Sequence, residues 1–265
     1  MKKSRLENYI NEIKLHEGKV LSVFITCGFP SPDGFEELVL SLFDAGADMI
    51  ELGVPFSDPI ADGSVIQFSS QQALSQGINL ERTLLIAEKI KSQSDKPIIL
   101  MGYANPFLSY GVSELAKSIK EIGIDGIIVP DVPIEEYDDF FEDNFNEVDT
   151  ILLVSPTTPT ERVIEIGNKS SGFVYCVSVK GITGKQHIEQ KNSIEYVRGL
   201  RHILKNKNIL VGFGISDEQT AYKFSGVSDG VIIGSAVIKS ILNSNGTYKE
   251  TLDFVKRIKN KISNY

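Results

Sequence analysis

The chain has 265 residues, of which 42% are hydrophobic, and its formal net charge at pH 7 is −8. This length and composition suit one large α/β domain with a sizeable core. The acidic balance argues against a general nucleic-acid binder or a protein that binds membrane surfaces, and no apolar run approaches the length needed to span a membrane.

Short apolar runs, each typical of a buried strand, recur along the chain and alternate with stretches of helical periodicity. Residues 20–26 predict the first strand. Ser31 and Pro32 then predict a helix N-cap followed by proline at the first helical position, and Gly46 predicts the end of that helix. Further strands are predicted at 48–52, 97–102, 125–129, 150–154, 172–177, 208–212 and 229–233. Helical spacing between them is clearest at Leu84, Ala87 and Ile90 and at Leu115, Ile119 and Ile122.

Eight strands with intervening helices predict a (β/α)8 TIM barrel, formed as a single domain over residues 1–265. An apolar stripe before the first strand predicts an extra N-terminal helix that covers the bottom of the barrel. Residues 248–261 predict a final helix. The alternative is a doubly wound open sheet, but that fold rarely needs eight evenly spaced units, and no GxGxxG motif follows the first strand. The apolar stripe that predicts the N-terminal helix consists of Leu6, Tyr9, Ile10 and Ile13.

Cysteine and histidine positions give no sign of a metal site. Cys27 and Cys176 are far apart and follow no metal-binding or redox spacing, and the three histidines are scattered. We therefore expect free thiols in a reducing compartment, which for this chain means the cytoplasm, with a plastid stroma as the alternative.

Residues 51–63, Glu-Leu-Gly-Val-Pro-Phe-Ser-Asp-Pro-Ile-Ala-Asp-Gly, are the most informative segment of the chain. Glu51 stands where the second strand ends, and Asp58 and Asp62 lie in the loop beyond, because the prolines and glycines forbid a continuous strand or helix. A carboxylate at a strand end facing a second one on a loop can form an acid/base pair. The alternative for each loop carboxylate is a solvated or helix-capping side chain.

In barrels of this kind the active site lies at the C-terminal ends of the strands. Those ends carry Tyr103 and Asn105 after the third strand, Asp131 after the fourth and Tyr175 in the sixth. No lysine stands among them, which weighs against a Schiff-base aldolase, whose chemistry needs an amine nucleophile.

Glycine-rich turns follow the last two predicted strands. They read Gly212-Phe-Gly-Ile-Ser216 and Gly234-Ser235-Ala236. Small residues let backbone N–H groups approach an anion closely, and barrels often bind phosphate in these two loops. The alternative is that each glycine only turns the chain. The loop after the sixth strand, residues 180–187, contains Thr183 between glycines and predicts either a mobile lid or a surface loop.

Several of these segments resemble the tryptophan synthase alpha chain family. They are residues 46–63, 125–133 (Asp-Gly-Ile-Ile-Val-Pro-Asp-Val-Pro), 172–179, 181–184 (Gly-Ile-Thr-Gly), 212–216 and 234–235. They run from the second strand to the last, so the resemblance covers most of the chain, and the segment around Glu51 and Asp62 is long and distinctive.

The resemblance implies a lyase that cleaves indole-3-glycerol phosphate to indole and glyceraldehyde 3-phosphate, a retro-aldol step that needs no cofactor in this chain. It implies that Glu51 is the general acid/base, that Asp62 accepts the indole N–H, and that Tyr175 orients Glu51. Phe24 would pack on the indole ring. The remaining substrate-binding residues would be Tyr103, Thr183, Gly184, Gly212, Gly214, Gly234 and Ser235, with Gly184, Gly214, Gly234 and Ser235 holding the phosphate.

The resemblance also implies a partner, a pyridoxal-phosphate-dependent beta chain that receives the indole in an alpha2-beta2 heterotetramer. The loop from Pro55 to Gly63 and the segment 103–107 would contact it. One departure from the family pattern is Ser64, which stands where the family commonly has proline after Asp62-Gly63.

Three other functions remain open from the sequence. They are a stand-alone indole-3-glycerol phosphate lyase, a non-catalytic regulatory or binding subunit, and another phosphate-binding barrel such as an isomerase or a thiamin-phosphate-type synthase. The second would predict loss of Glu51 or Asp62, and the third leaves residues 51–63 unexplained.

Overall fold

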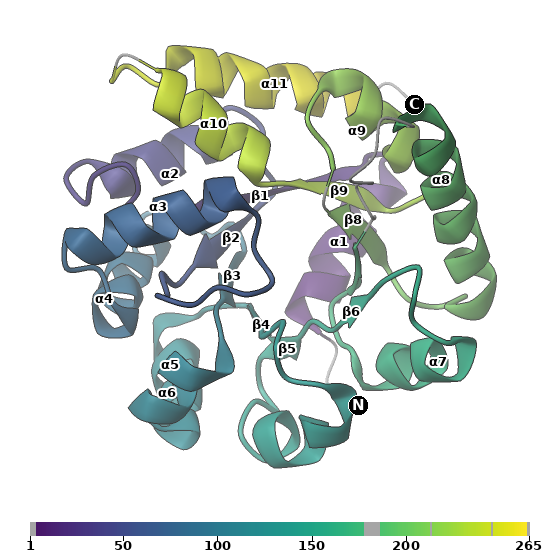
Figure 1. Ribbon diagram of the computed structural model, residues 1–265, viewed down its shortest axis with the longest axis horizontal. Coiled ribbons are helices and arrows are strands. Elements are labelled where there is room, and N and C mark those ends of the chain that lie inside the picture. Colours follow the sequence, from purple (N-terminus) through teal and green to yellow (C-terminus); the bar gives the residue numbers. More distant parts are fainter. Residues whose placement is uncertain (1–3, 178–185, 213, 245, 264–265) are drawn as a thin grey trace.

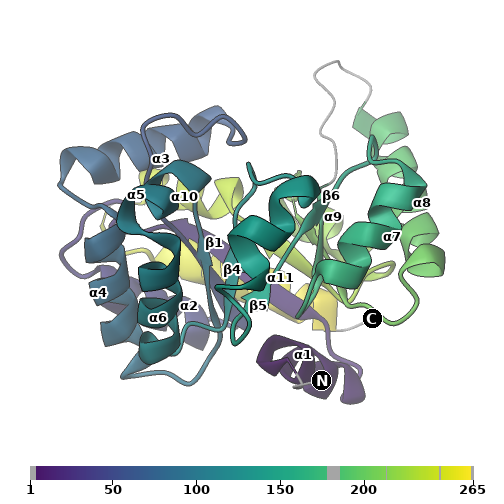
Figure 2. The same ribbon diagram turned by 90° about the horizontal axis from the view of Figure 1, so that it is seen from below.

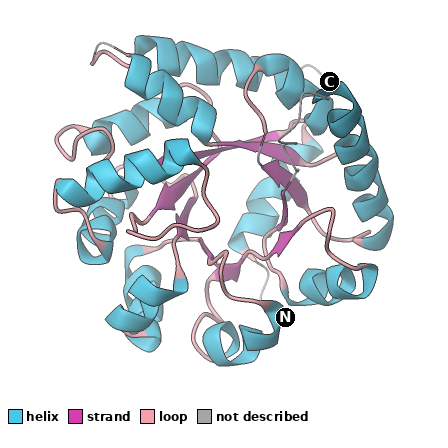
Figure 3. Ribbon diagram, viewed as in Figure 1, coloured by secondary structure: helices cyan, strands magenta, loops and turns pink. Residues whose placement is uncertain are grey.

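Parallel strands form the centre of the molecule, and helices surround them (Figures 1 and 3). The computed structural model describes residues 4–177, 186–212, 214–244 and 246–263. The strands are β1 (Val20–Thr26), β2 (Met49–Gly53), β3 (Ile98–Met101), β4 (Gly126–Ile128), β5 (Asp149–Thr150), β6 (Leu153–Val154), β7 (Val174–Val177), β8 (Ile209–Gly212) and β9 (Gly230–Ile233).

The strand order β5-β4-β3-β2-β1-β9-β8-β7-β6 describes a closed barrel, because β5 and β6 are two pieces of one segment. Within that segment the Ile151 N–H donates to the Ile127 carbonyl at 3.0 Å, and the Tyr175 N–H donates to the Leu152 carbonyl at 3.0 Å. The segment therefore joins β4 on one side and β7 on the other. The predicted (β/α)8 barrel is confirmed, and the open sheet is excluded. The single strand predicted at 150–154 is wrong in detail, since it is broken at residues 151–152.

The helices that surround the barrel include two at the predicted helical spacings, over Leu80–Lys91 and Val112–Ile122, and a last one over Lys249–Ser263, which was predicted at 248–261. The first loop differs from the prediction, because α2 begins at Phe35 and its N-cap is Gly34, which has a left-handed φ of 76°. Ser31 instead accepts a hydrogen bond from the Asp33 N–H at 3.2 Å, so Ser31 and Pro32 lie before the helix. The helices are α1 (Arg5–Leu15), α2 (Phe35–Asp44), α3 (Ser64–Ser75), α4 (Leu80–Lys91), α5 (Ala104–Tyr110), α6 (Val112–Ile122), α7 (Thr160–Lys169), α8 (Gln186–Ile203), α9 (Glu218–Ser225), α10 (Ser235–Asn243) and α11 (Lys249–Ser263), with a 3-10 turn at Ile134–Glu136 and a π-helical turn at Asp138–Glu142.

Side chains alternate along the strands between an outer core beneath the helices and an inner core that fills the barrel. The predicted N-terminal helix, α1, lies beneath the barrel, on the side opposite α3 (Figure 2). Its Leu6 and Ile10 are fully buried in the inner core, and burial of each stabilises the fold by about 1.5–3 kcal/mol. The inner core consists of Leu6, Ile10, Val20, Met49, Ile99, Ile128, Ile151, Phe173, Tyr175, Leu210 and Ile232.

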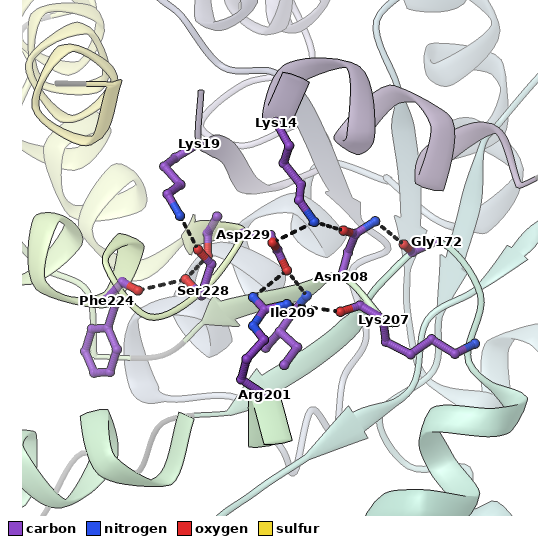
Figure 4. Close-up of polar contacts among 11 residues, drawn as sticks. Lys14, Lys19, Gly172, Arg201, Lys207, Asn208, Ile209, Phe224, Ser228 and Asp229 are labelled. Atoms are coloured by element: carbon purple, nitrogen blue, oxygen red, sulfur yellow. Dashed lines mark hydrogen bonds and ion pairs between the residues drawn. The ribbon is translucent and has the colours of Figure 1, made fainter. Parts of the chain in front are cut away.

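Aspartates secure the N-terminal ends of the strands, which form the bottom of the barrel. Asp48, Asp125 and Asp229 each stand one residue before a strand, and each accepts a backbone N–H from the start of the neighbouring strand at 2.7–2.9 Å. At Asp229 the two carboxylate oxygens also bind Lys14, at 2.9 Å, and Arg201, at 2.7 Å (Figure 4). This end of the barrel is thus closed by α1 and ion pairs, and the opposite end is left for a ligand.

Among the described residues, none of the helices is long and apolar enough to cross a membrane.

Candidate active site

Glu51 is a fully buried carboxyl group inside the barrel. It lies on β2 directly opposite Phe24 of β1. The Ser22 hydroxyl donates a hydrogen bond to its Oε1 atom at 2.8 Å, whereas Oε2 has no hydrogen-bond partner among the described residues. Burial disfavours the charged carboxylate and raises the pKa of Glu51 to about 8, although the Ser22 hydrogen bond opposes the shift. Glu51 is therefore mostly a neutral acid near pH 7.

Asp62 lies in the loop between β2 and α3, and Tyr103 holds it there. The Tyr103 hydroxyl donates to Asp62 Oδ2 at 2.9 Å and accepts the Ala61 N–H at 3.0 Å. Burial raises the pKa of Asp62 to about 6, and the hydrogen bond from Tyr103 opposes that rise. Asp62 therefore remains largely ionised near pH 7, so the two carboxyl groups favour opposite protonation states.

A cavity opens at the C-terminal ends of the strands, and six of the predicted site residues line it. Its wall combines two aromatic rings and several apolar side chains with one carboxylate and the glycine-rich turns. Glu51 lies beneath this wall and has no exposed surface. Tyr103 lines an adjoining hollow together with Phe24 and Asp62. The predicted residues around the cavity are Phe24, Asp62, Tyr175, Gly214, Gly234 and Ser235, joined by Ile66, Met101, Ile215 and Ile232.

The glycine-rich turns bring backbone close to the cavity. A Cβ atom at Gly212 would lie 2.2 Å from the Tyr175 hydroxyl oxygen, so only glycine fits there without moving Tyr175. Gly234 is the N-cap of α10, and Ser235 is the first residue of that helix. The first N–H groups of a helix lack internal partners and carry the positive end of its dipole. This side of the cavity can accept an anion.

Tyr175 borders the same cavity but makes no hydrogen bond to Glu51 in the described part of the chain. Its hydroxyl pKa is raised well above the usual value, first by burial and then by the charges of Glu51 and Asp62. The hydrogen bond to Glu51 comes from Ser22, which the sequence reasoning missed. The available signal was a polar residue in the middle of an apolar strand, two positions before Phe24 and therefore on the same face.

Three other strand-end residues lie away from the cavity. Asp58 and Asn105 are exposed, and Asp131 is exposed while accepting the Ala104 N–H at 2.9 Å. Thr183 and Gly184, predicted to bind substrate, lie outside the described residues.

The Asp62 loop ends at α3, and Ser64 is the first residue of that helix. The helix therefore begins where the family pattern places proline, but without the fixed φ of a proline.

Within the described ranges, no group of three or more His, Cys, Asp or Glu side chains is arranged to hold a metal ion.

The fold and the cavity define a class of protein, the (β/α)8-barrel enzymes, here with one carboxyl group inside the barrel and another at its mouth. Comparison with known proteins narrows this class. The family description "Tryptophan synthase alpha chain" matches residues 10–264. A tryptophan synthase alpha chain from Hydrogenovibrio crunogenus is 40% identical over 246 residues, which cover 92% of this chain and 90% of the relative. Another from Thermoanaerobacter is 39% identical over 261 residues, covering 97% and 98%.

Solved structures agree with the sequence relatives. The tryptophan synthase alpha subunit of Legionella pneumophila superposes with a TM-score of 0.85 at 31% identity and covers 99% of each chain. A ligand-free tryptophan synthase from Mycobacterium tuberculosis gives a TM-score of 0.87 at 27% identity, covering 98% and 99%. The chain belongs to the tryptophan synthase alpha chain family, and it is a lyase of tryptophan biosynthesis.

Proposed function

We propose that Glu51 and Asp62 cleave indole-3-glycerol phosphate to indole and glyceraldehyde 3-phosphate in this cavity. The observation that carries the proposal is the Glu51 carboxyl group, which is sealed inside the barrel, has one oxygen without a partner and has a pKa raised to about 8. A group with these properties can both give and take a proton near neutral pH. Because Glu51 has no exposed surface, side chains of the cavity wall have to move aside for the substrate to reach Oε2.

The reaction needs one proton delivered and one removed. Indole C3 is a poor carbanion, so neutral Glu51 first protonates C3 and produces a positively charged indolenine. The resulting carboxylate then takes the proton of the hydroxyl group on the adjacent glycerol carbon. The C–C bond breaks, its electron pair returns to the ring as neutral indole, and the former hydroxyl carbon becomes the aldehyde of glyceraldehyde 3-phosphate. Glu51 ends the cycle protonated, as it began.

Asp62 serves the same step electrostatically. Its carboxylate accepts the indole N–H, which carries positive charge after protonation at C3, and a negative group fixed in advance stabilises that charge. Tyr103 supports this role because its hydrogen bond holds Oδ2 at the cavity wall.

The remaining contacts follow from the two sides of the cavity. Phe24 offers an aromatic face for the indole ring. The backbone at Gly214, Gly234 and Ser235 receives the phosphate, supported by the start of α10. Gly212 contributes by leaving room for Tyr175. Thr183 and Gly184 complete the substrate contacts in the proposal.

The test of the acid/base role is Glu51→Gln, which keeps the shape of the side chain and removes proton transfer. Cleavage should fall by about 10²–10⁴-fold, while binding of glycerol phosphate persists. Asp62→Asn should also be severe, because an amide does not offset the positive charge at the indole nitrogen. Indole release at the wild-type rate from Glu51→Gln would refute the assignment.

The phosphate site is tested by Gly234→Val. A Cβ atom at this position already lies 3.2 Å from Phe24, and the larger side chain blocks approach of the backbone. Glycerol phosphate and substrate should both bind more weakly, and indole should change little. Equal weakening of all three ligands would place the phosphate elsewhere or indicate a disturbed fold.

The proposed partner is a tryptophan synthase beta chain in an alpha2-beta2 assembly in the cytoplasm, with pyridoxal phosphate in the beta chain only. Apolar side chains at the mouth of the barrel support this, since Ile60, in the Asp62 loop, is 83% exposed and Leu108, on α5, is 59% exposed. Contact at these positions can order the Asp62 loop and shift the site toward its active arrangement.

Titration with a beta chain tests the partnership. Release of glyceraldehyde 3-phosphate should accelerate as beta chain is added, and Ile60→Asp should abolish the acceleration without changing the rate of the isolated chain. An unchanged rate, with no complex in sedimentation, would favour a stand-alone lyase.

A further inference from the structure

We propose that Ser22 is a positioning residue for this reaction, because its hydroxyl keeps Oε1 of Glu51 as a hydrogen-bond acceptor and so leaves Oε2 as the oxygen that exchanges protons with the substrate. The inference rests on the proposed role of Glu51.

The surroundings of Ser22 leave its hydroxyl few choices. Ser22 is fully buried in β1, and its register partners on the two neighbouring strands are Met49 of β2 and Ile232 of β9, both in the apolar inner core. A buried hydroxyl without a partner is costly. The one side-chain hydrogen bond that the described residues give Ser22 is the 2.8 Å contact with Glu51 Oε1.

This contact makes the two oxygens of Glu51 unequal. A neutral carboxylic acid has one oxygen that only accepts hydrogen bonds and one that carries the proton. With Ser22 donating to Oε1, the proton belongs on Oε2, which is the oxygen without a partner. A proton on Oε1 would instead oblige the Ser22 hydroxyl to accept, and its own hydrogen would lose Glu51 as a partner.

The same hydrogen bond suits both protonation states. Ser22 can donate to the carbonyl-like oxygen of the neutral acid and to the carboxylate that forms when the proton leaves. The donor therefore need not move during the proton transfer, which is the arrangement that makes electrostatic stabilisation effective. Ser22 has no exposed surface and does not line the cavity, so its effect on the substrate passes through Glu51.

The experiment compares Ser22→Ala with Ser22→Thr, which keeps the hydroxyl and suits a strand. For Ser22→Ala, kcat for cleavage of indole-3-glycerol phosphate should fall about tenfold or more, as expected for a lost hydrogen bond to a charged group. KM should stay nearly constant, because Ser22 does not touch the substrate. The alkaline limb of the kcat–pH profile should move to higher pH, because Ser22 lowers the pKa of Glu51. Ser22→Thr should restore kcat and the profile toward wild type.

The matched control is Ser228→Ala at the bottom of the barrel. The Ser228 hydroxyl is also buried and donates to backbone carbonyls of Phe224 and Gly230. This control should lower Tm by an amount similar to Ser22→Ala and leave kcat and the pH profile unchanged. A measurement independent of turnover is the C=O stretch of Glu51 in infrared difference spectra against Glu51→Gln, which should titrate at higher pH in Ser22→Ala.

A double-mutant cycle of Ser22→Ala and Glu51→Gln distinguishes failure of the proposed role of Ser22 from failure of the proposed role of Glu51. If Glu51→Gln is inactive but Ser22→Ala keeps the wild-type kcat, pH profile and infrared titration, the role of Ser22 is refuted and that of Glu51 stands. If Glu51→Gln is fully active, the proposed function fails first. If both roles hold, Ser22→Ala should cause no further loss in the Glu51→Gln background, since the two residues act as one unit.

Discussion

Glu51→Gln should make the protein more stable at alkaline pH while it removes activity. A carboxyl group whose pKa is raised in the folded state binds its proton more tightly there than in the unfolded chain. Its favourable contribution to the free energy of unfolding is therefore fully present below the pKa of the group in the unfolded chain. This contribution is lost as pH rises toward the pKa of the group in the folded state. For Glu51 this window runs from 4.5 to about 8. Glutamine does not titrate, so its cost is the same at every pH.

The size of the effect follows from the same two values. One proton per molecule changes the free energy of unfolding by about 1.4 kcal/mol per pH unit across the window. From 4.5 to about 8 the advantage of Glu51→Gln over wild type should grow by at most about 5 kcal/mol and level off above that range. Asp62 is present in both proteins, so its own titration cancels in the comparison.

The assay is urea unfolding of wild type and Glu51→Gln at pH 5, 6, 7, 8 and 9. The control is Glu88→Gln on α4, where the side chain is exposed. The difference in free energy of unfolding between this variant and wild type should be the same at every pH. If the free-energy difference between wild type and Glu51→Gln does not change with pH, then Glu51 is not held neutral by burial, and the reasoning about its acid form is wrong.

Three further variants test the loop, the cavity wall and the barrel bottom. Tyr103→Phe removes the donor that lowers the pKa of Asp62, so the pKa of Asp62 should rise above about 6. The acid limb of the kcat/KM–pH profile should then move to higher pH, and kcat/KM at pH 6 should fall about tenfold. An acid limb at the wild-type pH would contradict this role of Tyr103. Gly212→Ala places a Cβ atom 2.2 Å from the Tyr175 hydroxyl oxygen. Substrate binding, measured by calorimetric titration, should weaken, and the free energy of unfolding, measured in urea, should fall by about 1–3 kcal/mol. Wild-type affinity for the substrate would show that Tyr175 moves freely. Asp229→Asn should destabilise the fold at pH 7 by about 1–2 kcal/mol, less than a sealed pair because Lys14 and Arg201 are about one-third exposed. Burial alone would raise the pKa of Asp229, but Arg201 and Lys14 outweigh burial and lower that pKa. The difference in unfolding free energy between Asp229→Asn and wild type should therefore shrink as pH falls below 3.8. A difference that is constant with pH would assign the effect to packing.

The pattern of apolar runs was enough to predict the barrel and the helix beneath it. Strand and helix periodicity are local properties, and eight alternating units leave few ways to bury every apolar face. Local rules were weaker at boundaries. Ser31 and Pro32 have the chemistry of a helix start, but Gly34, with its left-handed φ, begins the helix three residues later. Likewise, the run at 150–154 is apolar throughout, and only its pairing with β4 and β7 reveals the break at residues 151–152.

The candidate site divides in the same way. Glu51 and Asp62 could be chosen from the sequence, because they stand at a strand end and in the loop beyond it, within the segment that most clearly resembles the tryptophan synthase alpha chain family. Their protonation states could not, since each depends on atoms from other elements. Ser22 reaches Glu51 from the neighbouring strand, and Tyr103 reaches Asp62 across 41 positions of the chain. A pKa depends on burial and on the partners of both oxygens, and these exist only once the barrel has closed around the carboxyl group.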